Sequence, residues 1–506
     1  MRKVRVKNSR YVRKRDKDMI EPVPLSRIHP CNHATVNGHG AYVLYWMTAN
    51  RRRHWNFALQ RAVHWASELR KPLVILEALG CNYRWASARI HSAILQGMRD
   101  NLNDFEGSGA HYYPFVERFP SQGKGLVAAL AQDSCIVITD DYPAFEIPRW
   151  IEAAAKHVSV LMEKIDSNGI FPMRATDRTF VSAHSFRRFL QKNLREHLEA
   201  FPVADPLVNA DLPRLKPSMF LPDRQAATAD ELSSPHSLAA TISIDHSVQP
   251  VKAFESGSAA ARNRLRLFTK KRLPSYAESR NDPDADVSSS LSSDLHFGHL
   301  SAHEIFDDVM RSVRWSPEKL SSLATGSRES WWNAGPNAEA FLEQLVTWRE
   351  LGFNGCALLP DYGHYSSLPQ WAQRTLDAHS ADARSVLYSR AQLENAETHD
   401  ALWNAAQIQL LCEGRIHNYL RMLWGKKILE WSRVPEDALV TMIDLNNKYA
   451  LDGRDPNSYS GIFWILGRYD RPWGPERAVF GTVRYMSSAN TARKVHVKDY
   501  IRRYSK

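Results

Sequence analysis

Cysteine is scarce in this sequence of 506 residues, and its placement argues against the common metal frameworks. No Cys-x-x-Cys pair occurs, so zinc and iron–sulfur sites are not expected and we predict no metal. An odd number of cysteines without a framework suits a reducing compartment. The five residues are Cys31, Cys81, Cys135, Cys356 and Cys412.

Long apolar runs are also missing. No run approaches the length needed to cross a bilayer, and the N-terminus lacks the apolar core of a signal peptide, so no membrane partner is expected. A third absence is the Gly-x-Gly-x-x-Gly fingerprint after the first predicted strand. The chain instead continues Trp46-Met47-Thr48-Ala49-Asn50-Arg51-Arg52-Arg53, which disfavours a Rossmann-type dinucleotide site.

Positive charge and tryptophan, in contrast, are plentiful. Lys and Arg number 66 against 55 Asp and Glu, a formal net charge of +11. This excess favours a polyanionic partner, with nucleic acid first. The 15 tryptophans fit an aromatic-lined site. Residues 1–35 form a basic extension that we interpret as a solvated tail, with a weak DNA contact as the alternative. Its basic residues are Arg2, Lys3, Arg5, Lys7, Arg10, Arg13, Lys14, Arg15 and Lys17.

Residues 36–200 alternate between short apolar strands and helices. This alternation predicts an α/β domain with a doubly wound parallel sheet, which would bind ligands at the carboxyl ends of its strands. A helix is expected at 55–69. The predicted strands are 41–47, 72–76, 112–116, 135–139 and 158–162.

Residues 201–261 differ in composition from what precedes them. Prolines interrupt the segment, and stretches rich in Ser, Ala and Asp follow, so we predict an interdomain linker that is partly flexible. The remaining residues, 262–506, have the patterns of an all-helical domain. The prolines are Pro202, Pro206, Pro213, Pro217, Pro222 and Pro235.

The most informative stretch runs from His399 to Met486. Asp400–Gln407 begins one predicted helix, and Arg415–Ser432 forms a second with apolar residues at the spacing of one buried face. Trp424 and Trp431 are two turns apart and so share one side of that helix. Composition and periodicity alone indicate a buried, tryptophan-rich helical domain and no particular reaction.

Four short sequence motifs in this stretch, called words below, indicate a family. In their order and spacing they resemble those of the class II DNA photolyases, flavoproteins that split cyclobutane pyrimidine dimers with light. The likeness is strongest from Pro274 to the end and weaker over the first 200 residues. The words are Leu402-Trp403-Asn404-Ala405-Ala406-Gln407, Arg421-Met422-Leu423-Trp424-Gly425-Lys426-Lys427-Ile428-Leu429-Glu430-Trp431, Leu451-Asp452-Gly453-Arg454-Asp455-Pro456-Asn457 and Arg484-Tyr485-Met486.

The resemblance implies a photolyase-like fold, with an antenna-type α/β domain and a C-terminal all-α FAD-binding catalytic domain. Tyr45-Trp46-Met47 is similar to the family's opening strand. An antenna chromophore could be bound, but its identity is not implied. The family pattern also implies UV-damaged DNA as the partner, a monomer and, in a prokaryote, a cytoplasmic enzyme at the nucleoid.

A loop rich in hydroxyl residues precedes a predicted helix. By itself such a loop supplies helix caps, and exposed amides and hydroxyls in this position can also hold a diphosphate. The resemblance assigns Tyr276 and this loop to the diphosphate and ribityl part of FAD. Ser293-Asp294 departs from the family, which commonly has Pro-aromatic there. The loop residues are Ser288, Ser289, Ser290, Leu291 and Ser292.

Further residues match the flavin's surroundings. Arg421 and Asp452 match the ion pair at the isoalloxazine, where the guanidinium would favour an anionic reduced flavin; an ordinary ion pair is the alternative. Asn446 matches the asparagine that faces the flavin's reactive nitrogen, and its amide can adapt to either protonation state.

Three tryptophans match the family's electron-transfer chain. Trp424 would lie nearest the flavin, Trp403 next and Trp431 outermost, so that electrons reach the flavin through them. Tyr388 matches a tyrosine beside this chain, with a packed core tyrosine as the equal alternative.

The lesion side of the site is also matched. Arg280 and Asn281 match contacts to the damaged strand, and Trp348 lies on a predicted helix at 337–351. One turn earlier stands Gln344, where a glutamate is expected, with Glu343 adjacent. An amide can hydrogen bond but cannot act as an acid. Gly467–Asp470 is a second departure, one residue short of the family form. The remaining lesion-side residues are Met422, Trp464, Arg471, Trp473 and Arg484; hydrophobic packing is the alternative for the two tryptophans.

These matches imply light-driven DNA repair by a deoxyribodipyrimidine photolyase, a carbon–carbon lyase. Excited reduced FAD would donate an electron to the flipped-out dimer, the cyclobutane ring would open and the electron would return. A six-four photoproduct photolyase is one alternative, motivated by Gln344 and Gly467–Asp470. A cryptochrome-like blue-light receptor is another, and a flavin-free DNA-binding protein is a third.

Overall fold

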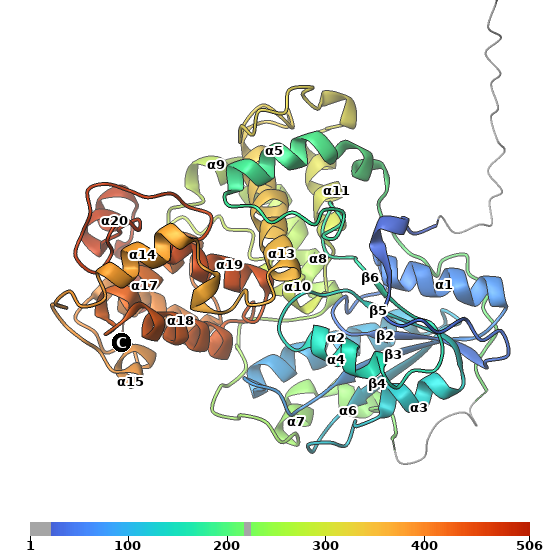
Figure 1. Ribbon diagram of the computed structural model, residues 1–506. Coiled ribbons are helices and arrows are strands. Elements are labelled where there is room, and N and C mark those ends of the chain that lie inside the picture. Colours follow the sequence, from blue (N-terminus) through green and yellow to red (C-terminus); the bar gives the residue numbers. More distant parts are fainter. Residues whose placement is uncertain (1–21, 217–223, 506) are drawn as a thin grey trace, which may run out of the picture.

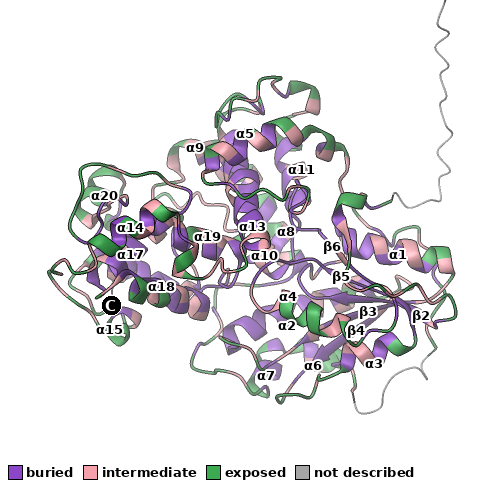
Figure 2. Ribbon diagram, viewed as in Figure 1, coloured by how far each residue is buried: buried purple, intermediate pink, exposed green. Residues whose placement is uncertain are grey.

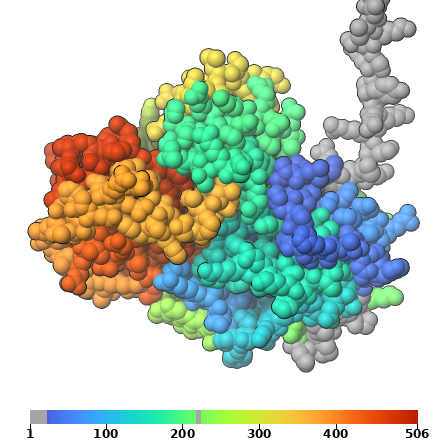
Figure 3. Space-filling view, viewed as in Figure 1, coloured from blue at the N-terminus to red at the C-terminus, as the bar shows by residue number. Residues whose placement is uncertain are grey.

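The computed structural model describes residues 22–216 and 224–505 (Figure 1). The basic residues of the N-terminal extension, Arg2 to Lys17, lie outside the described residues, as do Pro217 and Pro222. The sheet occupies one side of the molecule and the C-terminal helices occupy the other (Figure 1), and the blue and red ends of the colour scale accordingly lie on opposite sides in Figure 3. Within the part of the chain that is described, no helix is long and apolar enough to span a bilayer.

A six-stranded sheet forms the N-terminal part, in the order β1-β6-β5-β2-β3-β4. All neighbours are parallel except β1 and β6. The parallel α/β domain predicted from the sequence is therefore confirmed. The strands are β1 (Ile28–Pro30), β2 (Tyr42–Met47), β3 (Leu73–Leu79), β4 (His111–Val116), β5 (Ser134–Asp140) and β6 (Met162–Ile165).

Two strands differ from the sequence prediction. The fifth predicted strand, 158–162, forms at Met162–Ile165 instead. The apolar pattern did not predict these bounds because Glu163 and Lys164 are charged. In the structure Arg61 pairs with Glu163 at 2.8 Å and so compensates the charge of this carboxylate within the strand. β1 was not predicted, because a three-residue edge strand ending in Pro30 carries no periodic signal.

Helices cover both faces of the sheet. Alternate strand residues point to opposite faces: Val43 and Tyr45 pack with α1 residues such as Phe57, whereas Leu44 and Trp46 pack with α3 and α4. α1 ends where predicted and begins two residues later than predicted, at Phe57, because the side chain of Asn56 accepts the amides of the first turn. These helices are α1 (Phe57–Leu69), α2 (Ala88–Phe105), α3 (Leu126–Gln132) and α4 (Ile147–Ala155).

The described part of 201–261 contains two short helices, α6 (Ala229–Ser233) and α7 (Pro235–Ala240). Leu232 and Leu238 are buried against α2 residues such as Ile94. α5 (Ala183–Asn193) instead packs into the core of the helical part, which favours a boundary before the predicted residue 200.

Buried residues run through the interior of the helical part (Figure 2). Its longer helices are α8 (Ser258–Leu267), α11 (Ala302–Ser312), α13 (Arg349–Leu358), α14 (Gln370–Ala378), α16 (Ala401–Glu413), α17 (Asn418–Trp431), α18 (Pro435–Tyr449) and α19 (Pro456–Ile465). Shorter ones are α9 (Tyr276–Ser279), α10 (Ser292–Phe297), α12 (Pro336–Leu342), α15 (Arg390–Glu394), α20 (Ser488–Lys494) and α21 (Lys498–Arg503).

Two of these helices differ locally from the prediction. The helix expected from Arg415 begins at Asn418, because Gly414 adopts φ +65° and ends α16, leaving residues 415–417 as a connector. The helix expected at 337–351 is interrupted by a π-helical turn, η7 (Glu343–Trp348). Such turns re-aim side chains and are frequent at functional sites.

Candidate active site

A cavity of about 410 Å³ lies within the helical part. This volume is within the usual range for cofactor sites. Twelve of the predicted site residues line it: Tyr276, Ser288, Ser289, Ser290, Leu291, Ser292, Gln344, Trp348, Arg421, Met422, Asp452 and Trp464. Residues more than 180 positions apart in the chain therefore meet at one cavity.

The hydroxyl-rich loop forms one wall of the cavity. Arg272 donates to the carbonyl of Ser288 at 3.0 Å, and Arg415 lies 3.4 Å from the hydroxyl of Ser290. Arg415 also pairs with Asp286 at 3.5 Å. The loop thus presents hydroxyls and a guanidinium to the same space, a combination that suits an anionic group such as a diphosphate.

His417 supplies polar atoms that have no partner in the described structure. The residue is 5% exposed and lines the cavity, and both of its ring nitrogens lack a hydrogen bond. Burial lowers the pKa of His417 to about 4. An unsatisfied buried polar group is costly, so these nitrogens fit a ligand that bonds to them. Sequence reasoning did not select His417, although it lies within the matched stretch.

The predicted ion pair is present near the N-terminal end of α17. Arg421 contacts Asp452 at 3.2 Å and lies 3.4 Å from the side-chain oxygen of Asn446. Asn446 is buried and also donates to Asn447 at 3.2 Å. Although Asn446 is not part of the cavity wall, Arg421 connects it to that wall. The structure therefore brings these three predicted residues together.

The three predicted tryptophans are buried beside one another in α16 and α17, outside the cavity wall. The indole of Trp403 donates to the backbone carbonyl of Trp424 at 2.9 Å, and its ring lies 5.5 Å from that of Trp431. All three are at most 1% exposed. Tyr388 lies away from the cavity, with its ring 5.2 Å from that of Trp431. The ring contact between Trp403 and Trp431 is suited to electron hopping, and hydrophobic packing alone would produce the same burial.

Trp348 and Trp464 line another side of the cavity, and a group of aromatic and basic side chains outside the wall adjoins Trp464. The rings of Trp348 and Trp464 are 6.5 Å apart and nearly perpendicular. Arg484 stacks on Trp464 and Trp473 at 5.3 and 4.0 Å. Arg471 stacks on Trp473 at 4.4 Å. Such rings can stack on bases, and such arginines can contact phosphates.

Asp470 organises this group. Arg484 donates to it at 2.9 Å and the indole of Trp473 at 3.1 Å. Burial opposes its ionisation, but the hydrogen bonds from Arg484, the Arg471 amide and Trp473 outweigh burial and lower the pKa of Asp470. The shortened Gly467–Asp470 segment thus still provides a carboxylate that orients the arginine.

Arg280 and Asn281 are not in the cavity wall. Arg280 lies 5.9 Å over the ring of Tyr276, and Asn281 is exposed. The next residue, Asp282, contacts His496 at 2.6 Å and so ties this loop to the C-terminal segment. These two residues lie on the surface beside the cavity.

The π-helical turn η7 decides which side chains enter the cavity. Gln344 and Trp348 line it, whereas the carboxylate of Glu343 binds Arg187 of α5 at 2.8 Å. Glu343 is buried in this contact and does not line the cavity. The amide of Gln344 is therefore the polar group that this turn offers.

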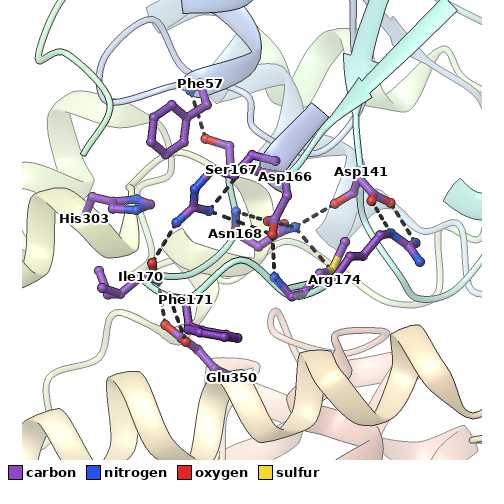
Figure 4. A network of polar contacts seen from close by, with 12 residues as sticks. Phe57, Asp141, Asp166, Ser167, Asn168, Ile170, Phe171, Arg174, His303 and Glu350 are labelled. Carbon is purple, nitrogen blue, oxygen red and sulfur yellow. Dashed lines mark hydrogen bonds and ion pairs between the residues drawn. The ribbon is translucent and has the colours of Figure 1, made fainter. Parts of the chain in front are cut away.

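Helix α13, which follows this turn, is hydrogen-bonded to the segment after β6 of the sheet domain (Figure 4). Glu350 accepts the amides of Ile170 and Phe171 at 2.6 and 3.1 Å, and Arg349 donates to the carbonyl of Asn168 at 2.7 Å. Burial raises the pKa of Glu350 to about 8. Because these contacts directly follow η7, the segment after β6 fixes the position of Trp348.

The cavity also has lining residues that the sequence did not single out as functional. Only Asp455 and Asn457 belong to the words quoted above, so position within those words was an available signal for these two alone. They include Leu295, Phe341, Leu345, Arg349, Arg415, Ile416, His417, Asn418, Asp455, Asn457, Ser458, Ser460, Gly461 and Ile465.

Comparison with known proteins gives relatives that match this chain over most of its length and of their own. A deoxyribodipyrimidine photo-lyase of Methanothermobacter thermautotrophicus is 32% identical over 94% of this chain and 97% of that protein. One of Oryza sativa subsp. japonica is 34% identical over 91% of this chain and 87% of that protein. One of Potorous tridactylus is 31% identical over 91% of this chain and 81% of that protein. No family model matches the chain.

A solved structure has the same fold. It is the crystal structure of a bacterial class III photolyase from Agrobacterium tumefaciens, with a TM-score of 0.65 over 92% of this chain and 86% of that chain. The sequences are 16% identical, so this likeness concerns the fold alone.

Proposed function

Because this chain belongs to the family of deoxyribodipyrimidine photo-lyases, we propose that it repairs cyclobutane pyrimidine dimers in UV-damaged DNA with light, using FAD. The assignment to class II rests on the sequence words and stays a prediction. The observation that carries the proposal is one cavity whose wall contains the Arg421–Asp452 pair, the hydroxyl-rich loop at 288–292 and the rings of Trp348 and Trp464.

The cavity fits FAD by its own chemistry. Its hydroxyl-rich loop and Arg415 suit the diphosphate, and the unpartnered nitrogens of His417 offer further hydrogen bonds. When bound, the reduced flavin supplies an electron on excitation and takes it back after the dimer has opened. The guanidinium of Arg421 favours negative charge beside it, because a Coulomb attraction is strong in a poorly solvated site.

On the lesion side, the chain's residues bind and orient. Trp348 and Trp464 supply ring faces for a flipped base, while Arg471 and Arg484 supply cations for the strand's phosphates. Gln344 can donate a hydrogen bond to a pyrimidine carbonyl but cannot protonate it. Ring opening breaks carbon–carbon bonds with no net redox change. The prediction of a monomeric enzyme belongs to the same proposal.

The direct test is photorepair of a thymine-dimer oligonucleotide by chemically reduced protein under blue light, beside a six-four oligonucleotide and a dark control. We expect repair of the thymine dimer alone. A Trp403→Phe variant should repair equally well after chemical reduction, yet fail to become reduced by light. Repair of only the six-four lesion, or flavin binding without repair of either, would contradict the proposal.

A further inference from the structure

A loop at residues 473–484 carries part of the lesion-side group. It folds back on itself, and the amide of Trp473 donates to the carbonyl of Thr482 at 2.8 Å. Trp473 stands at its start and Arg484 at its end, and the guanidinium of Arg484 stacks on the Trp473 ring at 4.0 Å. The contacts that hold this loop therefore also place the cation assigned above to the strand's phosphates.

The end of α14 and the turn after it hold the loop. The amide of Thr482 donates to the hydroxyl of Thr375 at 3.0 Å, and the amide of Val479 donates to the Asp382 carboxylate at 2.9 Å. The approach is close, because a Cβ on Gly481 would overlap the Thr375 hydroxyl. Val479 has φ +69°, which is unfavourable for a β-branched residue. The loop thus needs the contacts with α14 to keep its conformation.

His379, the first residue after α14, lies between two carboxylates. Its Nδ1 is 2.6 Å from Asp382, and its Nε2 is 3.0 Å from Glu476 of the loop. A neutral imidazole has one N–H, so its other nitrogen would present a lone pair to a carboxylate. Both contacts are hydrogen bonds only when the ring is an imidazolium. Hydrogen bonds to Glu476 and Asp382 accordingly raise the pKa of His379.

We propose that His379 is a positioning residue for the lesion side, which as an imidazolium links α14 to the loop at 473–484 and makes DNA binding depend on pH. This inference rests on the proposed function, because damaged DNA is the ligand whose contacts the loop places. Arg384 also faces this turn and donates to the carbonyl of His379 at 3.3 Å, but an arginine stays charged throughout.

The direction of the pH effect follows from the raised pKa of His379. The two charge-assisted bonds are present at low pH and are lost as pH rises above about 6.5, the ordinary histidine value, and through the raised pKa. Glu476 is exposed, so its carboxylate then turns to water. A less fixed loop must be ordered when it binds DNA, which costs affinity. His379 is outside the cavity wall, so the light-driven step itself is unchanged.

The test is the affinity of flavin-loaded protein for a thymine-dimer oligonucleotide from pH 6 to 9 at constant ionic strength. Wild-type affinity should fall about tenfold across this range, the scale of one charge-assisted hydrogen bond. His379→Gln should bind at every pH as weakly as the wild type at pH 9, with kcat for photorepair unchanged. His64→Gln is the matched control and should follow the wild type, since His64 pairs with Glu68 on α1 at 3.4 Å.

A second readout needs no DNA. In NMR of protein with labelled histidine, His379 should titrate above the ordinary histidine value, and Glu476→Gln should lower its midpoint. Parallel pH profiles of the wild type and His379→Gln, or an unchanged His379 midpoint in Glu476→Gln, overturn the inference alone. Equal affinity for damaged and intact DNA at every pH overturns the proposed function and this inference with it.

Discussion

Arg187 holds Glu343 away from the active-site cavity, with its Nε 2.8 Å from the Glu343 carboxylate, so the adjacent Gln344 is the residue that lines the cavity. The two partners are 156 positions apart and come from α5 and η7. This pair explains why a carboxylate one position away does not stand in for the glutamate expected at 344.

The first prediction concerns Gln344 itself. Gln344→Leu should weaken binding of a thymine-dimer oligonucleotide by about tenfold, because one hydrogen bond is worth about 1 kcal/mol. Gln344→Glu should keep both binding and photorepair. Fluorescence anisotropy and a photorepair assay measure these. Repair by the glutamate variant but not by the wild type would show that the amide does not suffice.

The second prediction concerns the Arg187–Glu343 pair. Glu343→Ala should lower the free energy of unfolding by about 3–5 kcal/mol, because it leaves a buried guanidinium without its carboxylate. The double variant Arg187→Met with Glu343→Leu should recover most of that loss. Chemical denaturation measures both. Equal stability of wild type and Glu343→Ala would mean that the pair does not hold η7.

The third prediction concerns His417. Because its ring nitrogens are unpartnered in the cavity wall, His417→Leu should weaken FAD affinity by about tenfold. Titration of apoprotein with FAD measures this. His364→Leu is the matched control, since His364 is exposed and outside the cavity wall. Unchanged affinity in His417→Leu would remove His417 from the flavin site.

The fourth prediction concerns pH. Burial raises the pKa of Glu350 from 4.5 to about 8 in the folded protein, so the folded state binds more protons than the unfolded state between these values. Stability contributed by this group must therefore fall as pH rises from about 4.5 to about 8. Below this window the wild type and Glu350→Gln should respond alike to pH.

Melting temperatures of the two proteins across pH 4–9 test this. The melting temperature of the variant should rise relative to that of the wild type as pH rises from about 4.5 to about 8, because the amide of the variant never ionises. Other buried groups titrate in both proteins, so the difference isolates Glu350. A difference that does not vary with pH would contradict the raised pKa.

The sequence by itself determined the fold class and much of the candidate site. Alternating apolar strands predicted the parallel sheet, since a strand buried on both faces must be apolar. The sequence also predicted that Trp424 and Trp431 are buried, which is confirmed, although α17 is buried around most of its circumference and not on one face alone. The matched words identified Arg421 and Asp452, a separate resemblance identified the loop at 288–292, and these residues do meet at one cavity. The order of residues within one segment is enough to predict such features, because they depend on neighbours along the chain.

Only the tertiary structure decided the contacts between distant segments. The direction of the Glu343 side chain depends on its contact with Arg187. The position of Trp348 depends on Glu350, whose carboxylate accepts hydrogen bonds from the backbone amides of Ile170 and Phe171. His417 became a candidate because α17 begins only at Asn418, which leaves residues 415–417 as a connector that lines the cavity. The contact between His379 and Glu476 likewise has no sequence signature. Such pairings depend on how helices pack against one another, and the periodicity of one segment does not encode its partner in another.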